Sequence, residues 1–185
     1  LRLADSLFAF ASELEISTCS EELCGFNRHE ISNNGWTNYP RLCELAEVAP
    51  LEMTEKKFLS RCKLLNEIIQ KIPNGKIRKI LIAMGANARD IKNLQSLKLL
   101  QGIYTVVDKL NENGENVQAL KGGAINIDIL VSQKAMAPLF VNNDLRNADA
   151  HAITQTVQTC LTSLDFDVAL LNDGYGLATD FMFDQ

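Results

Sequence analysis

The chain has 185 residues, of which 46% are hydrophobic and 22% are charged. These values are typical of a globular protein with a buried core, and they exclude an intrinsically disordered or low-complexity chain. No uninterrupted apolar run approaches the roughly 20 residues of a membrane-spanning helix. The N-terminus lacks the basic and apolar segments of a secretory signal. We therefore expect a cytoplasmic protein with no membrane partner. It begins at Leu1 rather than Met, so it can be part of a longer protein.

The five cysteines are odd in number, scattered and without a Cys-x-x-Cys pair. This pattern predicts reduced thiols rather than a disulfide framework. An alternative is a structural zinc site from Cys19, Cys24, His29 and Cys43, whose spacings lie at the loose end of the known patterns. Gly122-Gly123 lacks the residues of a phosphate-binding loop, so we expect no nucleotide cofactor.

The net charge of −5 is unevenly distributed along the chain. Residues 1–52, 53–98 and 99–185 carry −6, +8 and −7. Such a basic middle segment can form a face that binds a polyanion. The simpler alternative is that its basic side chains neutralise the acidic parts of the same fold, because position in sequence does not fix position on the surface.

The spacing of apolar residues predicts helices in chain order. Residues 3–14 have the pattern of an amphipathic helix. Residues 19–40 contain Gly25, Asn33-Asn34-Gly35 and Pro40, which predict a loop with turns. A short helix is expected over residues 41–48, ending before Pro50.

The basic middle segment contains the clearest helix, over residues 54–72, with Thr54 as its N-cap and Pro73-Asn74-Gly75 as the turn that ends it. One apolar stripe along it comprises Phe58, Cys62, Leu65, Ile69 and Ile72. Residues 77–84 are apolar and fit either a buried helix or a strand. A second long helix with a wide apolar face is expected over residues 89–111, closed by Asn113-Gly114.

In the last third, residues 125–129 alternate like one short strand or an extended loop. Asp144 is expected to cap a helix that continues to Leu164. A turn at residues 173–176 precedes a short helical tail. The predicted fold is mainly α: a helical bundle with an irregular N-terminal third and at most one short strand. We expect residues 1–52 to form a helix plus a loop-rich segment, and residues 53–185 to form the bundle, unless the chain is one domain.

The residues with the most distinctive chemistry are Arg146, Asn147 and His151. On a helix, Asn147 and His151 share a face, and the long side chain of Arg146 can lean over the same space. They supply a permanent cation, an amide and a group that titrates near pH 6.5. At the N-terminal turn of a helix, this set is suited to holding a phosphate and cleaving a phosphodiester without a metal.

The stretch Leu145-Arg146-Asn147-Ala148-Asp149-Ala150-His151 resembles the R-x(4–6)-H signature of the HEPN superfamily. The resemblance covers about seven residues, and the expected all-helical context agrees with it. It implies a metal-independent endoribonuclease, usually a homodimer, of the kind found in toxin–antitoxin, CRISPR and phage-defence systems. RNA would then be its partner, together with an antitoxin or another protein. His151 would act as general acid or base, Arg146 would stabilise the phosphate, and Asn147 would orient either one.

Candidate RNA-backbone contacts follow from the basic middle segment. They are Lys57, Arg61, Lys76, Arg78 and Lys79.

Three alternatives remain open for the motif. Arg146 can be tied to Asp149 or Asp144 in an ion pair, with His151 satisfied at a helix end. Asp144, Asp149 and His151 can bind a divalent metal, although spacing identifies no further ligand. The chain can also be a non-catalytic helical interaction domain that recognises a protein or nucleic acid.

Overall fold

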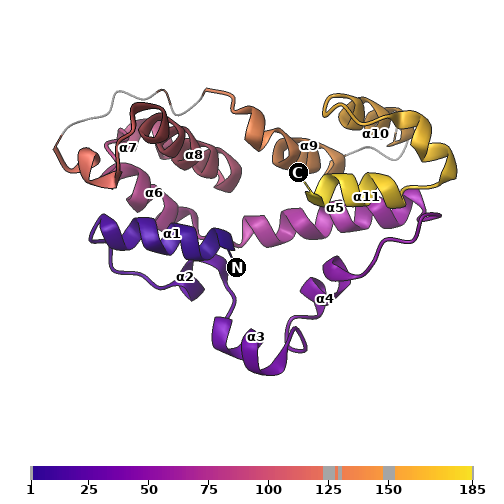
Figure 1. The fold of residues 1–185 in the computed structure, drawn as a ribbon, viewed down its shortest axis with the longest axis horizontal. Coiled ribbons are helices and arrows are strands. Elements are labelled where there is room, and N and C mark those ends of the chain that lie inside the picture. Colours follow the sequence, from indigo (N-terminus) through magenta and orange to yellow (C-terminus); the bar gives the residue numbers. More distant parts are fainter. Residues whose placement is uncertain (1, 123–127, 129–130, 148–152, 185) are drawn as a thin grey trace. The chain divides into compact units, whose positions relative to one another are not determined.

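The computed structural model describes residues 2–122, 128, 131–147 and 153–184. These residues form helices joined by turns and loops, with no strand among them (Figure 1). The prediction of a mainly α protein is therefore confirmed. The strand considered for residues 125–129 falls outside the described part of the chain, apart from Asp128. None of the described helices is both long enough and apolar enough to cross a membrane.

The chain forms two compact units, and each combines two separate stretches of sequence. The first unit comprises Leu1–Asn33 and Ile69–Gln133, and the second comprises Asn34–Ile68 and Lys134–Gln185. Neither unit is therefore a continuous segment.

The first unit is built on helix α6 packed against α8, with α1 packed against α2. Its core is aliphatic and includes Leu7, Ile77, Leu81, Leu99 and Val106, all nearly inaccessible to solvent. The apolar face expected along residues 89–111 supplies much of this core, whereas the stripe expected along residues 3–14 contributes Leu7 and leaves Leu3 exposed. Its helices are α1 (Arg2–Glu13), α2 (Ser20–Cys24), α3 (Arg28–Asn34), α6 (Asn74–Ala83), α7 (Ala88–Ile91), α8 (Ser96–Asn113) and η1 (Val117–Gly122).

The second unit gathers its C-terminal helices around α5 (Figure 1). Its elements are α4 (Pro40–Ala46), α5 (Glu55–Gln70), η2 (Lys134–Met136), α9 (Ala137–Arg146), α10 (Ile153–Thr162), η3 (Val168–Asp173) and α11 (Gly176–Asp184). Phe58 and Cys62 of α5 pack with Leu145, Val157 and Leu161 in one apolar cluster. Of the stripe predicted along residues 54–72, Phe58 and Cys62 therefore face this cluster, whereas Ile69 and Ile72 are buried in the first unit.

The expectation of a loop over residues 19–40 is wrong, because α2 and α3 form there. Both are short and depend on local hydrogen bonds rather than on an apolar period. The Glu22 carboxylate accepts from the Cys19 N–H at 3.3 Å, and Asn27 Oδ1 accepts from the Glu30 N–H at 2.8 Å. Such caps satisfy the free N–H groups of a first turn, which allows five- to seven-residue helices that periodicity does not detect.

The helix expected over residues 89–111 is divided into α7 and α8. The Arg78 guanidinium accounts for the interruption: it donates to the Ile91 carbonyl at 3.1 Å and to the Leu94 carbonyl at 2.7 Å. The last carbonyl of α7 and one in the link that follows therefore have a side-chain partner, and the chain can turn before α8 begins at Ser96. Residues 77–84, which sequence left open, belong to helix α6.

The turn at residues 173–176 docks on the backbone of residues 50–53. The Tyr175 N–H donates to the Met53 carbonyl at 2.8 Å, and the Gly176 N–H donates to the Leu51 carbonyl at 3.2 Å. A Cβ atom on Gly174 would lie 2.4 Å from the Leu51 carbonyl oxygen, and one on Gly176 would lie 2.4 Å from that of Pro50. The two glycines therefore permit a backbone-to-backbone approach that a side chain would block.

Candidate functional site

Arg146 and Asn147 lie at the C-terminal end of α9, with Asn147 as its C-cap. The expectation that Asp144 begins a helix carrying the motif is wrong: Asp144 lies in the last turn of α9, and α10 begins only at Ile153. A C-terminal turn carries the negative end of the helix dipole, which attracts the Arg146 cation rather than a phosphate. His151 lies outside the described residues.

Helix α9 is fixed to α5 by two asparagines. Asn142 is fully buried, and its amide donates to the Cys62 carbonyl at 3.0 Å. Asn143 Oδ1 accepts from the amide of Asn66, which is 1% exposed, at 3.1 Å. Leu145 inserts into the apolar cluster on the same side. These specific amide contacts favour one register of packing of α9 on α5, although the buried Asn142 Oδ1 has no hydrogen-bond partner among the described residues.

The two motif residues at the end of α9 are hydrogen-bonded to each other and to Asn143. Arg146 Nε donates to Asn147 Oδ1 at 3.3 Å, and the Asn147 amide donates to the Asn143 carbonyl at 3.1 Å. Sequence reasoning included Asn147 but missed Asn66, Asn142 and Asn143 as its supports. The available signal was an Asn-Asn pair within an otherwise apolar helix, since a buried amide needs a specific partner.

The first turn of α10 is fixed to α5 as well. Glu55 Oε2 accepts from the Thr154 hydroxyl at 3.0 Å and from the Tyr175 hydroxyl at 2.6 Å. Burial and the hydrogen bond to the Glu55 carboxylate raise the pKa of Tyr175 above its usual value, so its hydroxyl remains a donor. The described helix ends on both sides of residues 148–152 are therefore attached to α5.

The Arg146 guanidinium forms no ion pair with any carboxylate among the described residues. The alternative in which Asp144 neutralises it is therefore wrong, and Asp149 lies outside the described part. Asp144 instead lies near Cys160: burial and then the Asp144 charge raise the pKa of that thiol. The half-buried Arg146 cation is thus available to an external anion, as far as the described carboxylates are concerned.

In the first unit, two of the three predicted RNA-contacting side chains already have partners. Lys76 Nζ lies 2.8 Å from a carboxylate oxygen of Glu22. Arg78 donates to the carbonyls of Ile91, the last residue of α7, and of Leu94. Lys79 is exposed and remains accessible to solvent.

In the second unit, Lys57 is exposed on α5, whereas Arg61 is only 9% exposed. Arg61 lines a cavity together with Lys57 and is not positioned on an open surface. A phosphodiester backbone needs accessible cations, so burial makes Arg61 a weaker candidate than Lys57 for contact with RNA.

The zinc alternative fails on geometry. Cys19, Cys24 and His29 lie in the first unit, where no three metal-ligating side chains of the described residues converge, and Cys43 belongs to the second unit. The Cys24 thiol donates instead to the Phe26 carbonyl at 3.6 Å, and the Cys43 thiol donates to the Trp36 carbonyl at 3.4 Å. The metal set of Asp144, Asp149 and His151 includes two residues outside the described part.

Comparison of the chain with known protein families, with curated proteins and with solved structures finds no match. The function must therefore be argued from the residues and their geometry.

Proposed function

We propose that the chain is a HEPN-like, metal-independent endoribonuclease whose catalytic residues are Arg146, Asn147 and His151. One observation supports this most: Arg146 lies at the end of a firmly anchored helix without a described carboxylate to neutralise it. An uncompensated guanidinium presents planar donors to a phosphate, and guanidinium–phosphate hydrogen bonds are among the strongest in proteins.

The reaction needs no cofactor. A base removes the proton of the ribose 2′-hydroxyl, and the oxygen attacks the adjacent phosphorus. The bond to the 5′-oxygen breaks, that oxygen takes a proton, and the products carry a 2′,3′-cyclic phosphate and a 5′-hydroxyl. His151 serves as base or acid in this sequence. Arg146 stabilises the negative charge that grows on the phosphate oxygens.

Asn147 orients the phosphate or the imidazole. Its side chain is already fixed by Asn143 and Arg146, so little conformational freedom is lost when RNA binds. Lys57 and Lys79 supply sequence-independent contacts to the RNA backbone. In keeping with the resemblance, a second copy of the chain brings a second motif to the cleft, and a protein such as an antitoxin restrains the activity.

The test is cleavage of a mixed pool of single-stranded and structured RNA in the presence of EDTA. We expect products with cyclic phosphate ends, and no cleavage of DNA or 2′-O-methyl RNA of the same sequences, because both lack the attacking hydroxyl. The His151→Ala and Arg146→Ala variants should each lose about 10²–10⁴-fold in rate. The Arg146→Lys variant keeps the positive charge but lacks the planar donor geometry, so it tests the two properties separately.

A Lys134→Ala variant, which removes a basic residue outside the motif, serves as the matched control and should retain full activity. Circular dichroism checks the fold of every variant. Cleavage that persists in both motif variants, or that EDTA abolishes, contradicts the proposal. Light scattering on the same samples measures whether the active species is a dimer.

A second candidate is a non-catalytic helical interaction domain. The observation that favours it is the engagement or burial of three predicted RNA contacts: Lys76, Arg78 and Arg61. A folded protein that binds RNA weakly and cleaves none, at any concentration tested, would support this candidate over the ribonuclease.

A further inference from the structure

The cavity between α4 and the first half of α5 has an unusual charge arrangement. It has a volume of about 160 Å³ and lies wholly within the second unit. Met53 and Arg61 form its buried floor, and the exposed side chains of other lining residues form its rim. The lining residues are Glu44, Glu47, Val48, Pro50, Met53, Lys57, Ser60 and Arg61.

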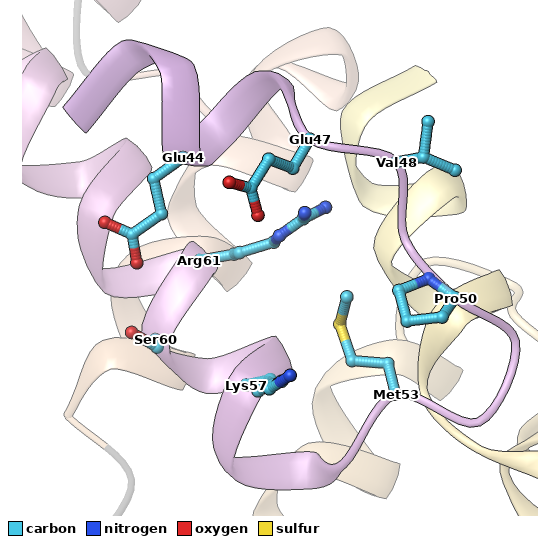
Figure 2. Close-up of a pocket in the computed structure, with 8 residues that line it drawn as sticks. All are labelled: Glu44, Glu47, Val48, Pro50, Met53, Lys57, Ser60 and Arg61. Carbon is cyan, nitrogen blue, oxygen red and sulfur yellow. The ribbon is translucent and has the colours of Figure 1, made fainter. Parts of the chain in front are cut away.

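Arg61 is buried without a protein partner. Its residue is 9% exposed, and no hydrogen bond or ion pair joins its side chain to the residues that the structure describes. Its guanidinium nitrogens are not among the fully buried polar atoms that lack a partner, so they face the cavity, where an anion can reach them. Figure 2 shows its side chain extending from α5 toward the loop that carries Val48 and Pro50.

Side chains of opposite charge line the two sides of the cavity. Lys57 and Arg61 are four residues apart on α5 and share one face. Glu44 and Glu47 are three residues apart at the end of α4, and Figure 2 shows the Glu47 carboxylate turned toward Arg61. No ion pair forms between these two rows among the described residues.

The packing of α4 explains why the charges stay apart. None of the α4 residues is fully buried, and its two leucines, Leu42 and Leu45, are only half-buried. Its beginning is held by the ion pair between Arg41 and Glu67. The cavity is therefore formed between a helix that is fixed at one end and the polar side of α5.

We propose that this cavity binds a small zwitterion: a molecule that carries an acidic oxyanion group and an amine a few bonds apart. The oxyanion lies on Arg61 and Lys57, the amine lies on Glu44 and Glu47, and the apolar part contacts Met53 and Val48. The balanced lining charge fits a ligand without net charge. The volume is below the ~300–1,000 Å³ of pockets for drug-sized molecules, so the ligand has the size of an amino acid.

The oxyanion can be a carboxylate or a phosphate, since guanidinium binds both in the same planar geometry. Thermal unfolding and calorimetry of the full chain distinguish them with two groups of probes: the standard amino acids, added first as a mixture and then singly, and phosphoethanolamine. Acetate and methylammonium, each carrying half of the ligand's charges, should bind at least about tenfold more weakly than the best zwitterion.

Two variants test the two sides of the cavity independently. Arg61→Gln and Glu47→Gln should each weaken binding by about tenfold or more, because each removes a charge-assisted hydrogen bond. Lys63→Gln, an exposed change on the same helix, is the matched control and should bind as the wild type does. Without ligand, Arg61→Gln should unfold at the same temperature or a higher one, because Arg61 makes no ion pair among the described residues whose loss would lower stability.

The proposal is overturned if no zwitterionic probe raises the unfolding temperature, if acetate alone binds as tightly as the zwitterion, or if both cavity variants keep wild-type affinity. It is also overturned if ligand-free Arg61→Gln unfolds several degrees lower, since Arg61 would then be a structural residue. Glu47 is exposed, so its variant tests the site even where the Arg61 variant folds poorly. None of these results depends on ribonuclease activity.

Discussion

Ionisable side chains in the second unit differ in how deeply they are buried and in the partners that surround them. The Cys62 thiol is completely buried between α5 and the C-terminal helices. Arg61, its neighbour in sequence, is buried beside a cavity, while Arg146 is only half buried and faces no described carboxylate. Neither arginine forms an ion pair with a carboxylate among the described residues, and both proposals rest on this property.

The Cys62 thiol predicts a dependence of stability on pH. Burial raises its pKa from 9.0 to about 12, so the folded protein favours the protonated thiol. The resulting contribution to the free energy of unfolding is fully present below pH 9 and is lost as the pH rises toward 12. We expect Cys62→Ala to be less stable than the wild type at pH 7, by roughly 1–2 kcal/mol from the void that the sulfur leaves. The variant should lose less further stability between pH 9 and 12.

Urea unfolding at pH 7, 9, 10 and 11 measures this difference. Cys43→Ala is the matched control, because Cys43 is exposed and its removal should change neither the stability at pH 7 nor the slope. If the free energies of unfolding of Cys62→Ala and the wild type fall in parallel with pH, burial of this thiol does not contribute to the pH dependence of stability.

At the scale of elements, the second unit depends on a turn rather than on a helix for one of its closest contacts. The segment from Gly174 to Gly176 approaches the backbone of residues 50–53, and Tyr175 then reaches the Glu55 carboxylate at the start of α5. This single turn connects η3 and α11 to α5 and, through Glu55, to Thr154 of α10.

We expect Gly174→Ala to lower the free energy of unfolding by about 1–3 kcal/mol, the usual cost of forcing an extra methyl into a tight contact. Gly174 has a φ of 125°, and the new Cβ would meet the Leu51 carbonyl oxygen at 2.4 Å. The matched control is Gly75→Ala in the first turn of α6, where a Cβ meets nothing within 4 Å. It should be neutral or stabilising by up to about 1 kcal/mol. Chemical denaturation measures both, and equal stability of the two variants would contradict the steric explanation.

At the scale of the whole molecule, two compact units share one chain that passes between them more than once. Each unit has its own buried side chains: the aliphatic core of α6 and α8 in the first, and the cluster around Phe58 in the second. Because local opening follows contact density rather than sequence order, the two stretches of each unit should open together.

Hydrogen exchange measured by mass spectrometry tests this on the intact protein. In Gly174→Ala, exchange should rise in residues 34–68 and 134–185 together, while the amides of α8 keep their wild-type protection. A matching rise in α8 would show that the two units unfold as one cooperative body.

The sequence by itself determined the helical class of the fold and the main buried stripes. The period of Phe58, Cys62 and Ile69 identifies the buried face of α5, and Asn113-Gly114 identifies the end of α8, where Gly114 has a φ of 66°. Amphipathic spacing and glycine C-caps are local signals, so they can be read without a partner. The same local signal failed for α2 and α3, which are too short to show a period and depend on side-chain caps.

Only the tertiary structure decided how distant residues meet. It ended α9 at Arg146, attached that helix to α5 through Asn142 and Asn143, and paired Arg78 with the Ile91 carbonyl at the end of α7. It also assigned Arg61 to a cavity rather than to an open basic face. A sequence records which charges and amides exist, but their partners depend on chain segments tens of residues away. The energy of a buried polar group is set by those partners, so the site could be predicted by residue type and not by geometry.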